Sequence, residues 1–444
     1  MIMGNPLHRG LVSLFLFGLA GGVPVTAQEW DIPNQWANQL SAASGHRLQL
    51  SMESRGRYER WRGPARDLDT ALFRHRLSLS FKPVPWLKLA GAVRDSRAPG
   101  YGPGAPASVR DQADLHEAWF ELFPDRKRGF SFSAGRMAMS YGETRLMATS
   151  QWGNVPKTFD HARATWRTSH ARLDLFFASP IRVRQDMFNR PVLGEHLWGA
   201  YSTFAEVGGK HTLDLYALRK QVNRPAGFLG GSRLDGTDRL RIDTFGGRAT
   251  GPLGKNWKYG LEAAAQTGKI ARNSHRAFAW ASWLSRRWML GARNLDLHGE
   301  YKYASGAGSP VPGSAAGTFD SLYPSTHDKF GHMDLFGWKN IHYVKGLATL
   351  WVTKTVAVNF MYNSSWLASL KDSLYSASGS AIGRSPAGTA GRHVGQETDL
   401  FGTFRFHHFL FGAGGGYLFR GEFLRNVPAP VARTYLYVFH TYTF

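Results

Sequence analysis

The sequence predicts an all-β protein, a transmembrane antiparallel β-barrel of about 18 strands with short periplasmic turns and long extracellular loops. Three observations lead to this fold class. Apolar and polar residues alternate with a period of two along much of the chain, amphipathic helices are scarce, and short connections alternate with long ones. Because no apolar run reaches the roughly 18 residues of a membrane-spanning helix, strands are expected to cross the membrane.

The alternation is informative because its polar face carries charges. In one predicted strand Leu77, Leu79 and Phe81 share a face, and Arg76 and Lys82 lie on the opposite face. The dry interior of a β-sandwich could not accept such charges, since an unpaired buried charge is costly. A water-filled barrel lumen accepts them, with the apolar face turned to lipid.

The connections support a barrel. We predict strands at 47–60, 72–82, 86–95, 114–122, 130–136, 159–167, 172–178, 197–205, 211–219, 239–250, 257–267, 276–285, 293–304, 341–353, 356–367, 393–406, 409–421 and 433–444. Three of them, 197–205, 239–250 and 276–285, alternate poorly, so the count is 16 or 18. Gaps after even-numbered strands are short. The long gaps, expected to be extracellular, are 96–113, 137–158, 179–196, 220–238, 305–340 and 368–392.

The last segment is predicted to be the strand that closes the barrel. Counting back in twos from the aromatic Phe444 places Tyr442, His440, Val438 and Leu436 on one face. Closing strands of outer-membrane barrels carry lipid-facing residues in this alternation, with aromatic residues at the membrane interface. An edge strand of a soluble sandwich is the alternative interpretation of this segment alone.

The N-terminus predicts export. Arg9 is a positive n-region, Leu11 to Ala20 form an apolar stretch, and Val25-Thr26-Ala27 is a small-residue cleavage site. We therefore expect a signal peptide at 1–27 and one outer-membrane barrel domain at 28–444. The chain contains no cysteine, so no disulfide framework stabilises it. The expected location is the bacterial outer membrane, in contact with its lipid.

The charge of the chain indicates an anionic partner. The sequence has 54 basic and 32 acidic residues, for a formal charge of +22. Such a field attracts polyanions. Nucleic acid is excluded as the expected partner by the export signal, which leaves acidic polysaccharide, lipopolysaccharide or small anions.

Two segments carry a family resemblance. The first contains Gly135-Arg136, Ser140 to Leu146, Trp152-Gly153-Asn154 and Thr158 to Arg163, and the second contains Gly317 to Pro324, His327 and Phe330 to Ile341. Both resemble the alginate-export family of outer-membrane proteins, over nearly the whole mature chain. The resemblance implies an 18-stranded barrel whose basic, arginine-rich lumen passes an anionic uronic-acid polymer. An exporter of this kind would work with a periplasmic export scaffold.

Ten basic residues on the charged faces are the candidate pore lining. An anion in a narrow pore loses its hydration, and a guanidinium fork replaces it in bidentate fashion. The alternative is that these residues pair with lumen acids such as Glu53, Glu117, Glu121, Asp174, Glu262, Glu397 and Asp399 and simply fill the barrel. The candidates are Arg55, Arg57, Arg74, Arg76, Lys88, Arg94, Arg163, Arg167, Lys258 and Arg405.

For the remaining candidate residues, a structural role is the favoured interpretation. Trp119 and Phe401 share the charged faces and could stack on sugar rings, although filling the interior is the commoner role. Asp320, His327, His332 and Asp334 could bind a metal, but the surrounding aromatic residues suffice to explain an ordered loop folded into the barrel mouth. Neither a metal nor a cofactor is therefore expected. Asp160 beside Arg163 is predicted to be a fixed ion pair.

Three functions remain open on this basis. The first is a channel for an anionic polysaccharide, and the second is a small-anion or general porin. The third is a secreted β-protein that binds or cleaves carbohydrate. No nucleophile-elbow or phosphate-binding loop pattern is present, so we do not expect an enzyme.

Overall fold

The computed structural model describes residues 32–63, 67–102, 105–185, 187–223, 239–271, 273–308 and 316–444. The predicted signal peptide, 1–27, lies outside the described residues. Within the described part of the chain no helix is long and apolar enough to cross a membrane.

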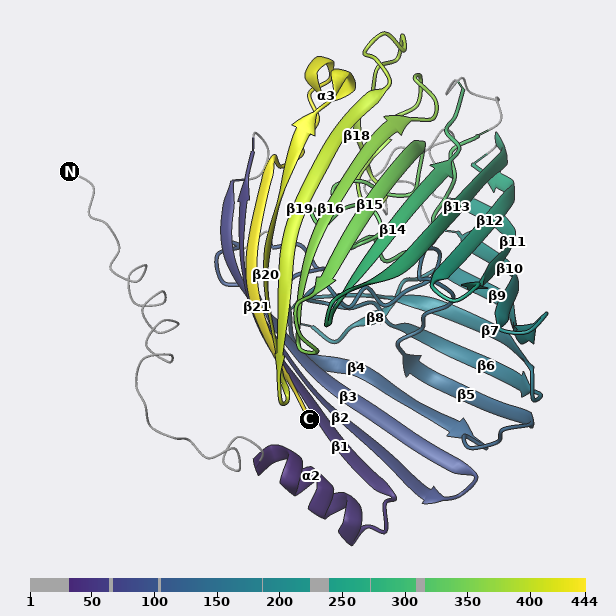
Figure 1. Ribbon diagram of the computed structural model, residues 1–444. Helices are drawn as coiled ribbons and strands as arrows, with labels where there is room; N and C mark the ends of the chain where they lie inside the picture. Colours follow the sequence, from purple (N-terminus) through teal and green to yellow (C-terminus); the bar gives the residue numbers. More distant parts are fainter. Residues whose placement is uncertain are drawn as a thin grey trace, which may run out of the picture.

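Eighteen antiparallel strands form a closed barrel (Figure 1). Closure occurs where the last strand pairs with the first, from Glu53 opposite Thr443 to Arg62 opposite Thr434. The strands are β1 (Leu48–Arg62), β2 (Leu68–Val84), β3 (Leu87–Arg97), β4 (Asp111–Leu122), β5 (Gly129–Met137), β6 (Phe159–Arg167), β7 (Ala171–Arg182), β9 (Glu195–Val207), β10 (His211–Val222), β11 (Leu240–Leu253), β12 (Trp257–Ile270), β13 (Asn273–Leu290), β14 (Arg293–Ala304), β15 (Ile341–Trp351), β16 (Val356–Leu367), β19 (His393–Phe406), β20 (Phe409–Arg420) and β21 (Thr434–Thr443).

The predicted fold class is confirmed, and the strand count is 18 rather than 16. Each predicted strand corresponds to an observed one, including the three that alternate poorly. The largest difference is β13, which has 18 residues where only 276–285 was predicted. The backbone hydrogen bonds of β13 to its neighbours continue beyond the predicted segment, because backbone pairing does not require alternating side chains.

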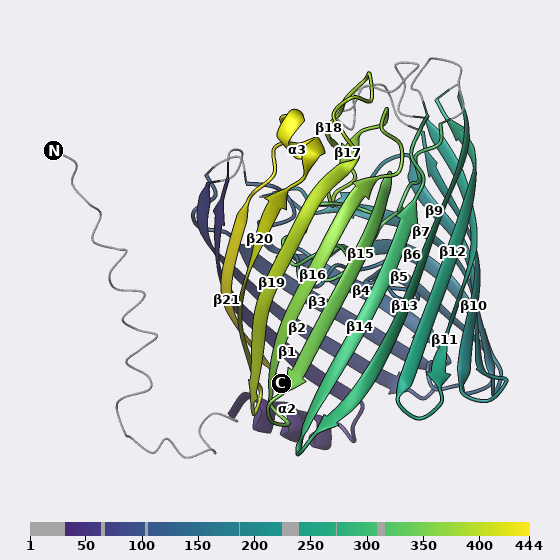
Figure 2. The ribbon, with the colours of Figure 1, turned by 45° about the horizontal axis from the view of Figure 1, so that its top comes forward.

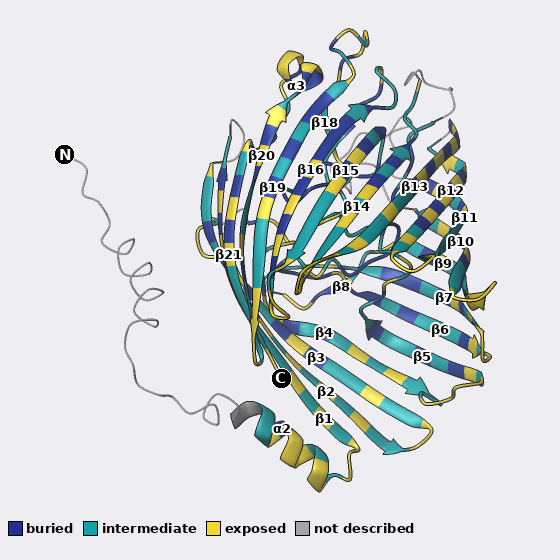
Figure 3. Ribbon diagram, in the orientation of Figure 1, coloured by how far each residue is buried: buried dark blue, intermediate teal, exposed yellow. Residues whose placement is uncertain are grey.

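The two faces of the wall differ as the alternation predicts, visible as bands of buried and exposed residues in Figure 3. Outward-facing apolar side chains keep between 44% and 61% of their surface exposed, as in Leu77, Leu175, Trp198, Phe360 and Leu400. Many inward-facing charged side chains are buried, and Arg74, Glu262, Glu300, Lys345 and Glu397 are at most 7% exposed. The barrel is therefore apolar outside and polar inside, which is the arrangement that lipid requires.

Short turns and long loops separate to opposite ends of the barrel. Figure 2 shows the long loops at one end and the short turns at the other, where β1 begins and β21 ends. The long-loop end also carries α3 (Glu422–Asn426), the hairpin β17 (Leu374–Tyr375) with β18 (Ala381–Gly383), and β8 (Arg190–Pro191), which pairs with the end of β7.

A helix below the short-turn end was not predicted from the sequence. It is α2 (Ile32–Ala43), a stretch that the sequence analysis assigned to the barrel domain. Its Gln, Ala and Leu residues are good helix formers. The helix ends before Gly45 and His46, whose φ angles of 60° and 61° are left-handed and stop the helical path.

The topology predicts which connections are accessible from outside the cell. An epitope tag at Gly379, between β17 and β18, should be labelled by antibody on intact cells, because this hairpin lies at the long-loop end. A matched tag at Gly208, in the turn between β9 and β10, should be labelled only after the outer membrane is permeabilised. The reverse pattern would contradict the assigned orientation. The corresponding site near Gly313 lies outside the described residues.

Candidate functional site

Two long loops fold into the lumen and meet there. We call residues 138–158, between β5 and β6, the first inner loop, and residues 316–340, before β15, the second inner loop. Backbone bonds join them: Ala148 N–H donates to Tyr323 O at 2.9 Å, and Tyr323 N–H donates to Leu146 O at 2.9 Å. Apolar side chains of both loops make the core of the lumen, and Met147, Phe319 and Trp338 are at most 1% exposed.

Three of the predicted pore-lining arginines hold the tip of the first inner loop. Arg57 donates to Trp152 O at 2.7 Å, Arg74 donates to Gly153 O at 2.7 Å, and Arg55 donates to the carbonyls of Gln151 and Gly153, each at 3.1 Å. The three arginine side chains are almost fully buried. They satisfy loop carbonyls that would otherwise lack partners inside the barrel.

Asn154 fixes the same tip to the wall. Its side-chain amide lies within hydrogen-bonding distance of three backbone carbonyls, those of Phe73, Arg97 and Val109, at 2.9–3.1 Å. Asn154 is 1% exposed. Arginines from β1 and β2 and this amide together determine the position of the loop tip.

The base of the first inner loop is held by a buried charge cluster that the sequence analysis missed. Arg145 forms ion pairs with Glu143 at 2.8 Å, with Glu262 at 2.9 Å and with Glu300 at 2.7 Å. Burial alone would lower the pKa of Arg145, but the carboxylates of Glu300, Glu143 and Glu262 raise it above its ordinary value. Arg145 lies in the first of the two segments that resemble the alginate-export family. No sequence pattern indicates that two of its ion-pair partners lie on strands more than 100 residues away.

The second inner loop makes a tight turn in mid-lumen. The ring of His327 stacks on Trp152 with a centroid distance of 4.1 Å, and His332 lies 3.9 Å from Phe401. His327 Nδ1 lies 2.9 Å from Asp334 Oδ2. Burial would lower the pKa of His327, but Asp334 and Asp328 raise it overall.

This turn, residues 326–334, lies between two lumen cavities. The outer cavity, about 620 Å³, opens towards the long loops and includes Arg94, Lys157, Arg182, His327 and Asp334 in its lining. The inner cavity, about 460 Å³, lies towards the short turns. Its charged lining residues are Lys258, Arg286, Arg287, Asp296, Asp328, Lys329 and Lys345. Residues of the turn line both cavities: His327 and Asp334 line the outer one, and Asp328 and Lys329 line the inner one.

The other predicted pore residues occupy varied positions. Arg76 pairs with Glu53 at 3.3 Å, Arg94 pairs with Asp111, and Arg167 lies 3.7 Å from Glu121 and donates to Ser131 Oγ. These acids take up much of the charge of their partners. Lys258 lines the inner cavity, and strand alternation puts Arg163 and Arg405 on lumen faces.

Lys88 and the two predicted lumen aromatics line different regions. Lys88 lies 5.2 Å over the ring of Trp119, in a cavity of about 520 Å³ beneath α2 at the short-turn mouth. Phe401 instead lines the inner cavity and contacts His332. Trp119 therefore stands at the mouth and Phe401 in mid-lumen.

The predicted ion pair of Asp160 with Arg163 is wrong. Asp160 pairs with Arg136, at 2.8 Å from Nε and 3.3 Å from Nη2. Residues three apart on a strand point to opposite faces, so Asp160 and Arg163 cannot meet on β6.

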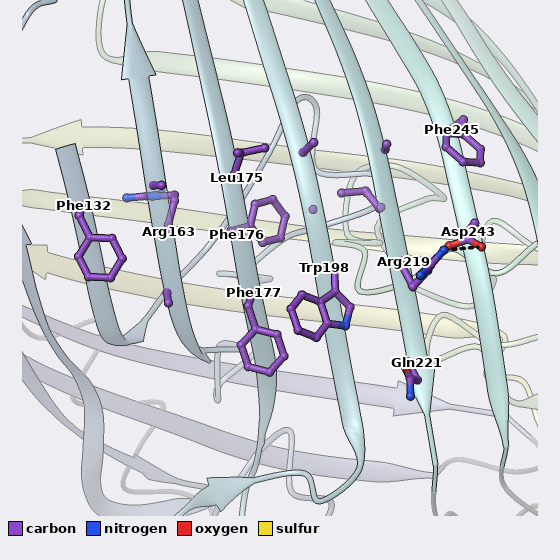
Figure 4. A pocket seen from close by; sticks show the side chains of 16 residues that line it. Phe132, Arg163, Leu175, Phe176, Phe177, Trp198, Arg219, Gln221, Asp243 and Phe245 are labelled. Atoms are coloured by element: carbon purple, nitrogen blue, oxygen red, sulfur yellow. Dashed lines mark hydrogen bonds and ion pairs between the residues drawn. The ribbon is translucent and has the colours of Figure 1, made fainter. Parts of the chain in front are cut away.

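A hollow of about 780 Å³ lies on the outer wall and is not part of the lumen. Figure 4 shows Leu175, Phe177, Trp198 and Phe245 around it, with the Arg219–Asp243 ion pair at its edge. Leu175, Trp198 and Phe245 are 50–55% exposed. Small outward residues such as alanine form its floor, so this surface faces lipid.

The Arg145 cluster predicts a strong effect on stability. Replacing Arg145 by Met removes the cation shared by the buried Glu262 and Glu300 and the partly exposed Glu143, so the free energy of unfolding should fall by about 3–5 kcal/mol. Urea unfolding in detergent, followed by tryptophan fluorescence, measures it. In the matched control Arg287→Met, the lost pair with Asp296 is half exposed, so the change should stay within about 1 kcal/mol. Equal effects of the two substitutions would contradict the assigned role of Arg145.

The comparisons with known proteins agree with this architecture. The model of the alginate export family matches residues 42–439, and no curated protein matches the chain. Among solved structures, the chain is similar to OccK1 (OpdK) of Pseudomonas aeruginosa, with a TM-score of 0.59 and 11% identity over 89% of this chain and 98% of that one.

A second similar structure is OccK2 (OpdF) of Pseudomonas aeruginosa in complex with glucuronate, with a TM-score of 0.58 and 10% identity over 89% of this chain and 98% of that one. OpdK has also been solved with vanillate. Identities this low show a shared barrel fold. With the family match, they make the protein a channel of the bacterial outer membrane. Its closed 18-strand wall, infolded loops and matched residues all lead to one conclusion: the chain belongs to the alginate export family.

Proposed function

We propose that this channel passes acidic saccharides without a catalytic step, with an anionic polysaccharide of the alginate type as its cargo. The observation that carries the proposal is the cationic lining of both lumen cavities. In the inner cavity, basic side chains outnumber acidic ones: Lys258, Arg287, Lys329 and Lys345 against Asp296 and Asp328. In the outer cavity the basic side chains are those of Arg94, Lys157 and Arg182, and the acidic one is that of Asp334.

The loop-holding arginines add to this field. A guanidinium that donates to a neutral carbonyl keeps its full positive charge, unlike one paired with a carboxylate. The group at the loop tip has four guanidiniums and two carboxylates, which leaves two positive charges: Arg55, Arg57, Arg74 and Arg76 with Glu53 and Glu59. A carboxylate in the lumen is therefore attracted even where no arginine fork is open to it.

A small-anion porin is the second candidate, favoured by the infolded loops. They divide the lumen into two cavities of about 620 and 460 Å³, and the OccK2 structure described above contains glucuronate, a single acidic sugar. A polymer that occupied both cavities would run past the 326–334 turn, whose residues line each of them. Such an exporter would also need a periplasmic scaffold to deliver the polymer to the mouth beneath α2.

The cationic lining predicts anion-selective conductance. Reversal potentials measured in planar bilayers under a KCl gradient should indicate preference for Cl⁻, weakening towards 1 M salt, where the screening length is about 3 Å. The double change Arg182→Glu and Lys258→Glu should reduce or reverse this preference. Arg74 and Arg76 are poor choices, because acids there would meet Glu53 and release the loop tip.

The matched control is Lys210→Glu, in the turn between β9 and β10 and away from both cavities. This substitution changes the net charge of the chain by as much as each of the two lumen substitutions does. It should leave the preference for Cl⁻ unaltered. Cation selectivity of the unmodified protein, or equal effects of lumen and control variants, would overturn the proposal.

Blockade by saccharides distinguishes the two candidate cargoes. Uronate oligomers should block the current more strongly than neutral oligosaccharides of equal length, because only the former carry carboxylates. For a polymer channel, blockade should strengthen with oligomer length, since successive units occupy the inner and outer cavities together. If monomeric uronate blocks as strongly as the longest oligomer, the small-anion porin is the better description.

A further inference from the structure

Three side chains of the 326–334 turn point their polar atoms at one spot. Asp328 Oδ1 lies 3.0 Å from His332 Nε2 and 3.6 Å from His327 Nε2. One ligand atom from each of the three residues lies within 4.8 Å of the others. The two histidine side chains are 9% and 6% exposed, while that of Asp328 is 63% exposed. Two buried imidazoles thus face an exposed carboxylate.

The other nitrogen of each imidazole has its own partner. His327 Nδ1 lies 2.9 Å from Asp334 Oδ2, and His332 Nδ1 lies 3.2 Å from the hydroxyl of Tyr437. Metal-binding histidines have this arrangement, because a partner on one ring nitrogen fixes the tautomer and directs the other lone pair at the ion. A ring nitrogen that faces a carboxylate either donates its own N–H to it or shares a cation with it, and in the second case its lone pair is directed at the ion.

The spacing matches a metal ion of zinc size. In a tetrahedral site with ligand bonds of about 2.0–2.1 Å, neighbouring ligand atoms are roughly 3.3 Å apart. The observed separations of 3.0 and 3.6 Å lie on either side of this value. Two imidazoles with one carboxylate suit Zn²⁺ and similar transition ions, whereas Ca²⁺ and Mg²⁺ prefer sites made of oxygen alone.

Carboxylates and basic groups both surround the turn. Asp334 contacts His327, and Glu397 accepts the backbone N–H of Met333, next to His332. With Asp328 these make three carboxylates. The opposing charges nearby are Arg57, whose guanidinium lies 4.2 Å over the Trp152 ring, Lys157 close to Asp334, and Lys329 next to Asp328. Lys345 donates to the backbone oxygen of Asp328 but is paired with Glu300 at 2.7 Å.

We propose that His327, Asp328 and His332 form a binding site for Zn²⁺ or a similar divalent transition-metal ion on the turn between the two lumen cavities. The exposed side of Asp328 leaves a coordination position open to the inner cavity. A bound ion locks the turn between the two cavities and presents a positive charge to a passing carboxylate. This inference does not depend on the cargo, since metal binding is measurable without any saccharide.

Calorimetry on the intact barrel tests the site. The purified mature protein in detergent is stripped with EDTA and titrated with ZnCl₂, and one ion per chain is expected. The double variant His327→Ala and His332→Ala should lose this binding. Asp334→Asn, which removes only the partner of His327 Nδ1, should weaken it roughly 10- to 100-fold. Binding of Co²⁺ should produce the visible absorption of a tetrahedral nitrogen and oxygen site.

Control variants and a folding check distinguish loss of the Zn²⁺ site from misfolding of the barrel. His211→Ala with His298→Ala removes two histidines outside the turn and should leave the affinity unchanged. Heat-modifiable gel migration checks that each variant is a folded barrel. Should the double histidine variant misfold, Asp328→Asn, whose side chain is exposed, is the substitute and should also weaken Zn²⁺ binding. Zn²⁺ binding that survives in these variants, or no stoichiometric binding by the unmodified protein, would overturn the proposal and leave a simple histidine–carboxylate cluster.

Discussion

Arg145 joins the first inner loop to the opposite wall through three carboxylates, and the arrangement of the lumen depends on this contact. Glu262 and Glu300 come from β12 and β14, and Glu300 also binds Lys302 and Lys345. Removing one member of such a buried network leaves uncompensated charge, which costs several kcal/mol. The contact therefore holds the loop across the lumen rather than along one side.

With its base held there and its tip held by arginines of β1 and β2, the first inner loop supports the second. Backbone bonds at Ala148 and Tyr323 join the two loops, and Trp152 stacks on His327. The 326–334 turn is thus positioned through the first loop as well as by the wall. This explains how a barrel of 18 strands, wide enough for an open channel, is divided into two moderate cavities.

The same arginines have two effects on the proposed function. Arg55, Arg57 and Arg74 are structural, because their donors satisfy loop carbonyls and are not open to a passing solute. Glu53 and Glu59 balance two of the four positive charges that these residues and Arg76 carry, and the remaining charge still acts at a distance. Selectivity in this lumen is therefore better attributed to the summed field of the lining than to a ladder of bidentate carboxylate sites.

The barrel architecture could be predicted from the sequence. Period-two alternation and the order of short and long connections are local properties, so strands, lipid face and orientation could be predicted from residues such as Leu77, Arg76 and Phe81 without knowing their neighbours. Helix α2 was missed because its short segment has no strong amphipathic pattern.

The contacts of each charged lumen residue depend on the tertiary structure and could not be predicted from the sequence. Arg145 meets carboxylates 117 and 155 positions away, and Arg55 meets carbonyls 96 and 98 positions away. The alternation assigns a side chain to a face, but the partner on that face depends on how the loops fold back between distant strands. Asp160 pairs with Arg136 because the two residues lie opposite each other on the neighbouring strands β5 and β6. The convergence of His327, Asp328 and His332 required the turn that the inner loops build together.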